Sequence, residues 1–210
     1  MVINAFRLTK YYGRVKVLDS LDLQVGRSEI AIVQGINGSG KTTLQSIFSS
    51  LTTADSGKAE ICGLDTGIRH LKARGMVGFV GPSSLLYGAL TVEENLSFFS
   101  KLYNCDQDRN YIEDLISQLG LSDRVDQRVN MLSHGFQKRV SIARALINKP
   151  KALLLDEPES GLDSDAARTL EKIIVGFAQR GGSVLITTHN NTLDYGRDVT
   201  RYSLIRGNLK

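Results

Sequence analysis

Apolar runs alternate with segments of helical periodicity along the chain. Short runs bounded by glycine, proline or polar positions predict strands. These runs lie at 29–34, 76–80, 152–155, 184–187 and 202–205. Between them, apolar positions recur at spacings of three and four, which predicts helices. The helices are expected near 41–50, 91–102, 111–119, 140–147 and 164–180. Strands that alternate with helices predict an α/β protein with a mainly parallel, two-faced sheet.

Several helix ends are marked by particular residues. Thr91 and Glu94 have the spacing of a capping box, in which each side chain bonds the other residue's backbone N–H. Gly120 suits the position just after a helix, and either Asp163 or Ser164 suits the N-cap of the next helix. The helix-rich stretch at about 88–147 is therefore expected to form a lobe inserted into a single domain of residues 1–210.

Composition excludes several classes of protein. The chain has 210 residues, of which 41% are hydrophobic and 23% charged, so it is not collagen-like, disordered or a coiled coil. No apolar run approaches the ~20 residues that a membrane-spanning helix needs, and no secretory signal is evident at the N-terminus. Cys62 and Cys105 provide neither a zinc pattern nor a disulfide framework. The net charge of +4 does not by itself indicate a partner, and no nucleic-acid partner is predicted.

A phosphate-binding loop lies between the first predicted strand and the helix that follows it. The segment 35–42 matches the pattern G-x-x-x-x-G-K-[ST] in the strand-to-helix context that this motif requires. Its backbone N–H groups and the helix N-terminus would bind the phosphates of a nucleotide. Lys41 would neutralise the β- and γ-phosphates, and Thr42 would bind Mg²⁺. The predicted nucleotide-binding residues of this segment are Gly35, Asn37, Gly38, Ser39, Gly40, Lys41, Thr42 and Thr43.

Two adjacent carboxylates end another predicted strand. Asp156 and Glu157 follow the apolar run 152–155, which places them at the carboxyl edge of a parallel sheet, where ligands bind. With the phosphate loop nearby, Asp156 is expected to hold Mg²⁺. Glu157 is expected to be the general base that takes a proton from the attacking water.

Four further motifs resemble those of ATP-binding-cassette (ABC) transporter nucleotide-binding subunits. The segment 132–139 resembles the family's signature, L-S-x-G-x-x-x-R, and 160–163 resembles its D-loop. His189, after the predicted strand 184–187, resembles the switch histidine. The segment 8–13 resembles the N-terminal stretch with an adenine-stacking tyrosine, which falls on Tyr12. Together with the phosphate loop and Asp156-Glu157, these motifs extend from residue 8 to residue 189.

The resemblance implies a fold and an assembly. The fold would be a P-loop NTPase core with N-terminal antiparallel strands and an inserted helical lobe. Two cassettes, in a homodimer or a heterodimer, would pair head to tail and hold two molecules of MgATP between them. Ser133 and Gly135 of one subunit would contact the γ-phosphate bound by the other subunit. Asp163 would contact the opposite subunit, and His189 would bind the γ-phosphate and the attacking water.

The sequence departs from the family pattern at three positions. Pro82 stands where most members have the Q-loop glutamine, so the link between the nucleotide and the helical lobe is expected to differ. His134 replaces the commonest glycine of the signature, and Phe136 replaces its usual glutamine. These positions vary in exporter-type members, so ATPase activity is still expected.

The resemblance favours an ATPase subunit that drives a membrane permease, on the cytoplasmic face of the cell membrane. The region 86–99 resembles the lobe that contacts the permease, and of Phe98 and Phe99 one is expected to be exposed and one buried. Few residues follow His189, which favours export. The chain also resembles the haem-exporter ATPase of cytochrome c maturation and drug, lipid and polysaccharide exporter cassettes. The alternative is a soluble cassette ATPase in assembly, of the iron–sulfur scaffold type. The chain lacks the long coiled coil of chromosome-type members and the second cassette of translation-type members.

Overall fold

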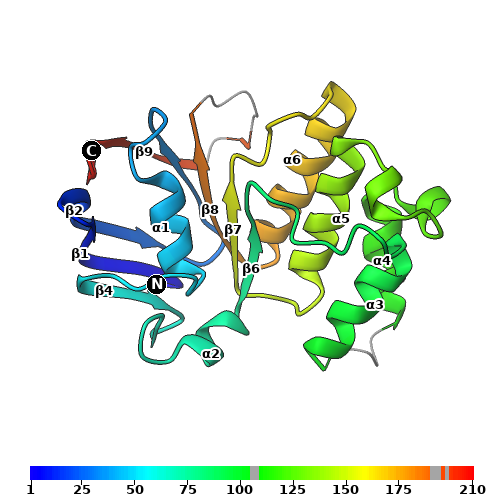
Figure 1. Cartoon of the computed structure of the whole chain (residues 1–210), viewed down its shortest axis with the longest axis horizontal. Helices are drawn as coiled ribbons and strands as arrows, with labels where there is room; N and C mark the ends of the chain where they lie inside the picture. Colours follow the sequence, from blue (N-terminus) through cyan, green and yellow to red (C-terminus); the bar gives the residue numbers. More distant parts are fainter. Residues whose placement is uncertain (105–108, 190–194, 197–198) are drawn as a thin grey trace.

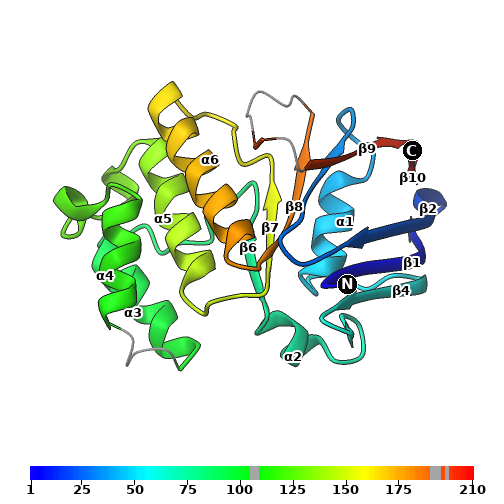
Figure 2. The same cartoon turned by 180° about the vertical axis from the view of Figure 1, so that it is seen from behind.

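The computed structural model describes residues 1–104, 109–189, 195–196 and 199–210. Two β-sheets and a group of helices form three regions in space (Figure 1). The antiparallel sheet and the helices α3 to α6 lie on opposite sides of a central sheet, and Figure 2 shows the same arrangement from behind. Cys62 is a free, half-buried thiol, and Cys105 lies outside the described residues.

The central sheet has the strand order β10-β9-β3-β8-β7-β6. All neighbouring pairs are parallel except β10 with β9, so the predicted mainly parallel sheet is confirmed. Each predicted strand is present, although the last begins earlier than its apolar run indicated. The strands are β3 (Ile30–Gln34), β6 (Val77–Val80), β7 (Ala152–Asp156), β8 (Ser183–Thr188), β9 (Val199–Ile205) and β10 (Asn208–Leu209).

The second sheet is antiparallel and has the order β2-β1-β4-β5. Its strands are β1 (Ile3–Tyr12), β2 (Val15–Val25), β4 (Ser56–Ile61) and β5 (Leu64–Asp65). The apolar pattern of β1 and β2 did not predict these strands, because shifts in register interrupt the alternation of faces. Arg7 and Ser20 have positive φ angles of 47° within these strands. The N-terminal antiparallel strands that the family resemblance implied are therefore present.

The helices are α1 (Lys41–Phe48), α2 (His70–Arg74), α3 (Val92–Leu102), α4 (Arg109–Gln118), α5 (His134–Leu146) and α6 (Ser164–Gln179). Short 3₁₀ turns cover Ser122–Arg124 and Val129–Met131. The predicted capping box is formed: the Thr91 hydroxyl accepts from the Glu94 N–H, and the Glu94 carboxylate accepts from the Thr91 N–H. Asp163 caps α6 through two backbone N–H groups. In the described ranges, each helix is either too short or too polar to cross a membrane.

Two hydrophobic cores lie on opposite faces of the central sheet. One contains α1 between the two sheets, and the other contains α3 to α6. Alternate residues of β3 serve the two cores, with Ile30 and Ile32 in the helical core and Ala31 and Val33 in the other. This alternation fixes the faces of the sheet and leaves its carboxyl edge free for polar residues.

Candidate functional site

The carboxyl ends of three neighbouring strands bring the predicted chemistry together. In the sheet, β8 lies between β3 and β7. The phosphate loop follows β3, His189 follows β8, and Asp156 ends β7. Because all three strands are parallel, these groups share one edge. The sequence prediction of a nucleotide site at this edge therefore agrees with the topology.

The phosphate loop packs so closely that two of its glycines have no room for a side chain. A Cβ on Gly35 would lie 2.5 Å from Ser39 Oγ and 2.7 Å from the Leu204 carbonyl oxygen. A Cβ on Gly40 would lie 2.9 Å from Leu18, and the φ angle of this residue is +109°. Glycine is therefore required at both positions by contact, and at Gly40 also by conformation.

Lys41 is buried at the start of α1. Its exposed fraction is 5%, and its ammonium donates to the carbonyls of Gly35 at 2.8 Å and Ile36 at 3.1 Å. The same Nζ lies 3.8 Å from Glu157 Oε1. The N-terminus of α1 has no side-chain cap, so its N–H groups and the lysine ammonium are suitable groups for binding an anion.

Glu157 and His189 form a pair in front of the loop. His189 Nδ1 lies 3.1 Å from Glu157 Oε1, so one carboxylate oxygen faces both His189 and Lys41. Glu157 has a φ angle of +46°, in the left-handed region. Its N–H donates to the Thr187 carbonyl at 2.8 Å, which holds the turn after β7 against β8.

Asp156 is almost fully buried, with 1% exposure. Its Oδ1 accepts from the Thr187 hydroxyl at 2.6 Å, whereas its Oδ2 has no hydrogen-bond partner in the described part of the chain. A buried carboxylate oxygen without a donor is costly unless a cation or water satisfies it. Asp156 and the exposed Thr42 are suitable Mg²⁺ ligands, since this ion is usually bound by few protein groups together with substrate phosphates.

Gln45 supports the site, and the sequence analysis missed it. Its buried amide donates to the carbonyls of Leu155 and Leu185 and to the Thr187 hydroxyl at 3.0 to 3.2 Å. It thereby joins α1 to the ends of β7 and β8. A polar residue four positions after Lys41, on the apolar face of the helix, was the available signal.

Glu159 was also missed. Its carboxylate accepts a hydrogen bond from the Thr188 hydroxyl. Burial raises the pKa of this carboxyl, the Thr188 hydrogen bond opposes the shift, and the nearby Glu157 adds to it. The turn after β7 is therefore tied to the end of β8 at Glu159 as well as at Glu157.

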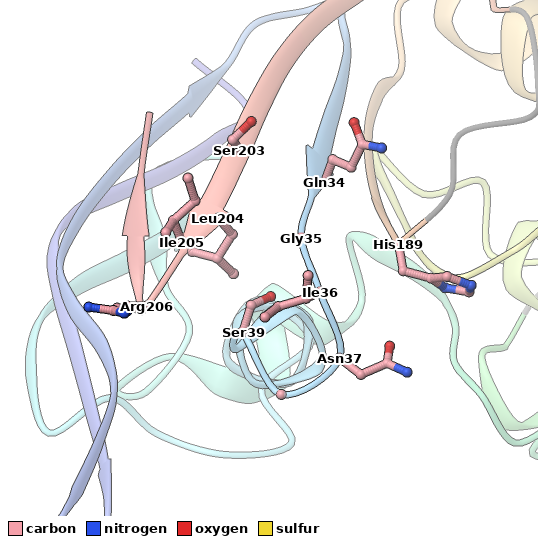
Figure 3. A pocket seen from close by; sticks show the side chains of 11 residues that line it. Gln34, Gly35, Ile36, Asn37, Ser39, His189, Ser203, Leu204, Ile205 and Arg206 are labelled. Atoms are coloured by element: carbon pink, nitrogen blue, oxygen red, sulfur yellow. The ribbon is translucent and has the colours of Figure 1, made fainter.

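A pocket of about 450 Å³ lies beside the phosphate loop. Figure 3 shows Ser203, Leu204 and Ile205 on one side of the loop and His189 on the other. The wall from β9 was not predicted, because its residues carry no motif. The lining is Gln34, Gly35, Ile36, Asn37, Gly38, Ser39, His189, Ser203, Leu204, Ile205 and Arg206.

Five of the predicted residues line this pocket, namely Gly35, Asn37, Gly38, Ser39 and His189, whereas Gly40, Lys41, Thr42, Thr43, Asp156 and Glu157 do not. Four more predicted residues, from the other motifs, also do not line it. Tyr12 is 52% exposed at the end of β1, with the Lys10 ammonium 5.5 Å from its ring centroid. Ser133 is the N-cap of α5, and its hydroxyl makes no capping hydrogen bond. Gly135 lies in the first turn of the same helix, and Asp163 is the N-cap of α6.

The three residues that depart from the family pattern differ in their surroundings. Pro82 is exposed in the loop after β6. The Phe136 ring lies between the guanidinium groups of Arg124 and Arg139, each 5.1 Å from its centroid. His134 packs so closely against the D-loop that a Cβ on Gly161 would lie 2.7 Å from His134 Nδ1. The signature and the D-loop of this chain are thus in direct contact.

A phosphate loop after β3, a buried lysine and a carboxylate pair at the end of β7 are the features of a P-loop nucleotide-binding protein. The family model described as ABC transporter matches residues 18–160. The chain therefore belongs to the ABC transporter family.

Relatives of similar length are ATP-binding proteins of transport systems. The chain is 34% identical to the lipoprotein-releasing system ATP-binding protein LolD of Porphyromonas gingivalis, over 94% of each chain. It is 36% identical to the lipopolysaccharide export system ATP-binding protein LptB of Haemophilus influenzae, over 92% of this chain and 83% of that protein.

Other relatives are longer. The chain is 32% identical to the daunorubicin resistance ATP-binding protein DrrA2 of Streptomyces coeruleorubidus, over 89% of this chain but only 58% of the relative. The chain thus spans little more than half the length of this relative. Among solved structures, the dimeric bacterial ABC transporter cassette MJ0796 is 27% identical, with a TM-score of 0.84 and coverage of 99% of this chain and 96% of that one.

Proposed function

We propose that the chain is the ATP-hydrolysing subunit of an ABC transporter that powers a membrane permease for export. The observation that carries the proposal is the placement of Glu157 Oε1, 3.8 Å from the phosphate-loop lysine and 3.1 Å from His189. A carboxylate held at the mouth of a phosphate site is suitably placed to take a proton from water there.

Lys41 would bind the triphosphate by exchanging partners. Its ammonium now donates to the carbonyls of Gly35 and Ile36. When the ammonium donates to the β- and γ-phosphates instead, these two carbonyls would accept hydrogen bonds from water or from the repositioned Lys41 side chain. The N-terminus of α1 has no side-chain cap, so the N–H groups of its first turn would also donate to the phosphates.

Glu157 and His189 would act on the attacking water. Glu157 would accept a proton from the water while the water oxygen bonds to the γ-phosphorus. At the same time the bond between the γ-phosphorus and the β-phosphate oxygen of the ADP leaving group breaks. His189, whose Nδ1 lies 3.1 Å from Glu157 Oε1, would orient that carboxylate and donate to the γ-phosphate. When bound between Thr42 and Asp156, Mg²⁺ supplies positive charge to the phosphate oxygens.

A second ABC ATPase subunit would complete the site. The Ser133 hydroxyl makes no capping hydrogen bond. The first turn of α5 also contains no acidic side chain that would repel an anion. Ser133 and Gly135 could therefore bind the γ-phosphate held by the opposite subunit. Asp163 would face that subunit from the start of α6.

The permease would dock on the lobe that we propose for residues 88–147. In this stretch α3 and α4 contact α5, and α5 in turn contacts β6. Phe98 is 41% exposed, and Phe99 packs against the helical core, as the sequence analysis expected. The Tyr87 ring lies 5.0 Å from Phe98 and 6.2 Å from Phe99, centroid to centroid. Docking here would hold the chain on the cytoplasmic face of the membrane. The cargo is left open, because the relatives above are named for different cargos.

The test compares Glu157→Gln with wild type and with Glu113→Gln, which changes an exposed glutamate of α4. We expect wild type and Glu113→Gln to hydrolyse ATP at equal rates. Glu157→Gln should keep ATP affinity and lose turnover by about 10²- to 10⁴-fold, as expected for a general base. Near-normal turnover of Glu157→Gln would contradict the role of this residue.

The transport role is tested separately. Tagged Glu157→Gln, with MgATP, is recovered from detergent-solubilised native membranes, and the proteins that accompany it are identified. We expect a protein with several membrane spans. Recovery of soluble assembly proteins alone would instead support the iron–sulfur scaffold type of role.

A further inference from the structure

Lys138 is a buried cation that the mechanism above does not use. It lies in α5, on the helix that begins after Ser133, and only 7% of it is exposed. Its Nζ lies 3.5 Å from the backbone carbonyl oxygen of Glu157 and donates a hydrogen bond to it. A side chain of the signature helix thus reaches the main chain of the residue proposed as general base.

Burial and nearby carboxylates act in opposite directions on the Lys138 ammonium, and the effect of burial is the larger. Burial lowers the pKa of the ammonium, and the nearby carboxylates of Glu159, Asp156 and Glu157 oppose that shift. Glu159 itself is held by the Thr188 hydroxyl at the end of β8. The ammonium therefore lies near the carboxylates at the end of β7 and in the turn after it, although no salt bridge within 4 Å joins it to them among the described residues.

Glu157 depends on its backbone contacts for its orientation. Its φ of +46° lies in the left-handed region, which a residue with a side chain rarely adopts unless its surroundings fix it. Its N–H is bonded to the Thr187 carbonyl at 2.8 Å, and its carbonyl accepts from Lys138. The direction in which the carboxylate points follows from this peptide geometry.

We propose that Lys138 is a positioning residue that holds Glu157 in its reactive orientation from the signature helix. This inference rests on the proposed ATPase function. The same helix begins at the residues that would meet the second subunit's nucleotide. If α5 shifts when it binds the nucleotide held by the second subunit, the Lys138 ammonium that donates to the Glu157 carbonyl would move with it. Contact with that nucleotide would thereby change the orientation of Glu157 in the same chain as α5.

The first test measures kcat and KM for ATP in Lys138→Met, which keeps the length of the side chain and removes the donor. A misplaced base costs turnover rather than binding, so we expect kcat to fall about 10- to 100-fold while KM stays within about twofold. Lys138→Arg, which keeps a buried cation and donors, should recover part of the loss. A fall in kcat that Arg does not relieve at all, or a KM that rises in proportion, would overturn the proposal.

Arg144 provides the matched control. It is also a buried cation of α5, with 7% exposure, and it donates to a backbone carbonyl, that of Phe79 on β6. Arg144→Met loses the same kind of interaction without touching Glu157. Turnover per folded molecule, with the folded fraction measured by circular dichroism, should stay near wild type. An equal loss of kcat in both variants would assign the effect to α5 packing and overturn the positioning role.

A double-mutant comparison separates positioning from general damage. If Lys138 acts through the Glu157 carboxylate, Lys138→Met should change single-turnover hydrolysis less than about twofold in a Glu157→Gln background. An equal loss in both backgrounds would contradict the proposal. If Lys138→Met does not fold, Lys138→Leu, which also lacks a donor, is used in the same comparison. Absence of hydrolysis by wild type would instead refute the proposed function itself.

Discussion

Glu157 is held through contacts to its backbone as well as through contacts to its carboxylate. The Thr187 carbonyl and the Lys138 ammonium hold its peptide groups, and His189 and Lys41 face its carboxylate. The sequence predicted roles for Glu157, Lys41 and His189 because each belongs to a motif. The contacts that Thr187 and Lys138 make with the Glu157 backbone join distant segments, so they depend on tertiary packing and leave no local pattern in the sequence.

A pH dependence is expected at Glu159. Burial raises the pKa of this carboxyl, so the folded state binds its proton more tightly than the unfolded state. Its contribution to stability therefore decreases as pH rises from the unfolded pKa through the folded pKa. The Glu159→Gln side chain keeps an acceptor for the Thr188 hydroxyl and does not titrate.

We therefore expect the stability of Glu159→Gln relative to wild type to rise as the pH increases above the unfolded pKa of a glutamate, about 4.3, with stability measured as the urea midpoint of unfolding. Glu113→Gln, at an exposed position, is the control and should show little change. A stability difference that does not depend on pH would contradict the expectation.

At the scale of elements, the sequence predicted best what local chemistry determines. The central strands were predicted from short apolar runs, and α3 and α6 began at their predicted caps. The antiparallel strands were expected only from the family resemblance, because bulges in β1 and β2 interrupt their alternation. The pocket wall on β9 was missed because side-by-side strands can be far apart in sequence, as β3 and β9 are.

The α3 capping box provides a stability prediction. Thr91→Ala removes the side-chain acceptor for the Glu94 N–H. We expect the free energy of unfolding to fall by about 1 kcal/mol, the usual cost of losing an N-cap. Urea denaturation checks this, and Thr91→Ser, which keeps a hydroxyl, should stay close to wild type. A loss shared equally by Ala and Ser would point to the methyl group instead of the cap.

At the scale of the molecule, the proposed site is divided between two surfaces. The phosphate loop, Asp156, Glu157 and His189 meet at one edge of the sheet, while Ser133 and Gly135 begin a helix that does not line the same pocket. In a head-to-tail pair, each nucleotide would take its phosphate loop from one chain and its signature from the other.

Mixing two inactive variants tests this division. Lys41→Ala would remove the phosphate counter-charge, and Ser133→Arg would obstruct the signature. We expect neither to hydrolyse ATP alone, whereas a mixed pair has one site built from two intact halves. Activity should therefore return on mixing, measured as phosphate release. If it does not, the chain does not form a functional pair with itself, and a different cassette would be its natural companion.

The alternation of β3 between the two cores restricts how the chain length can vary. Ile30 and Ile32 face one core, and Ala31 and Val33 face the other. Inserting one residue would exchange these sets, so both cores would receive side chains of the wrong size at once. Inserting two residues would restore the faces but displace Gly35 from the Leu204 carbonyl that it approaches. Insertions and deletions in this strand are thus expected to be destabilising whether their length is odd or even, whereas loops away from this edge should tolerate changes in length.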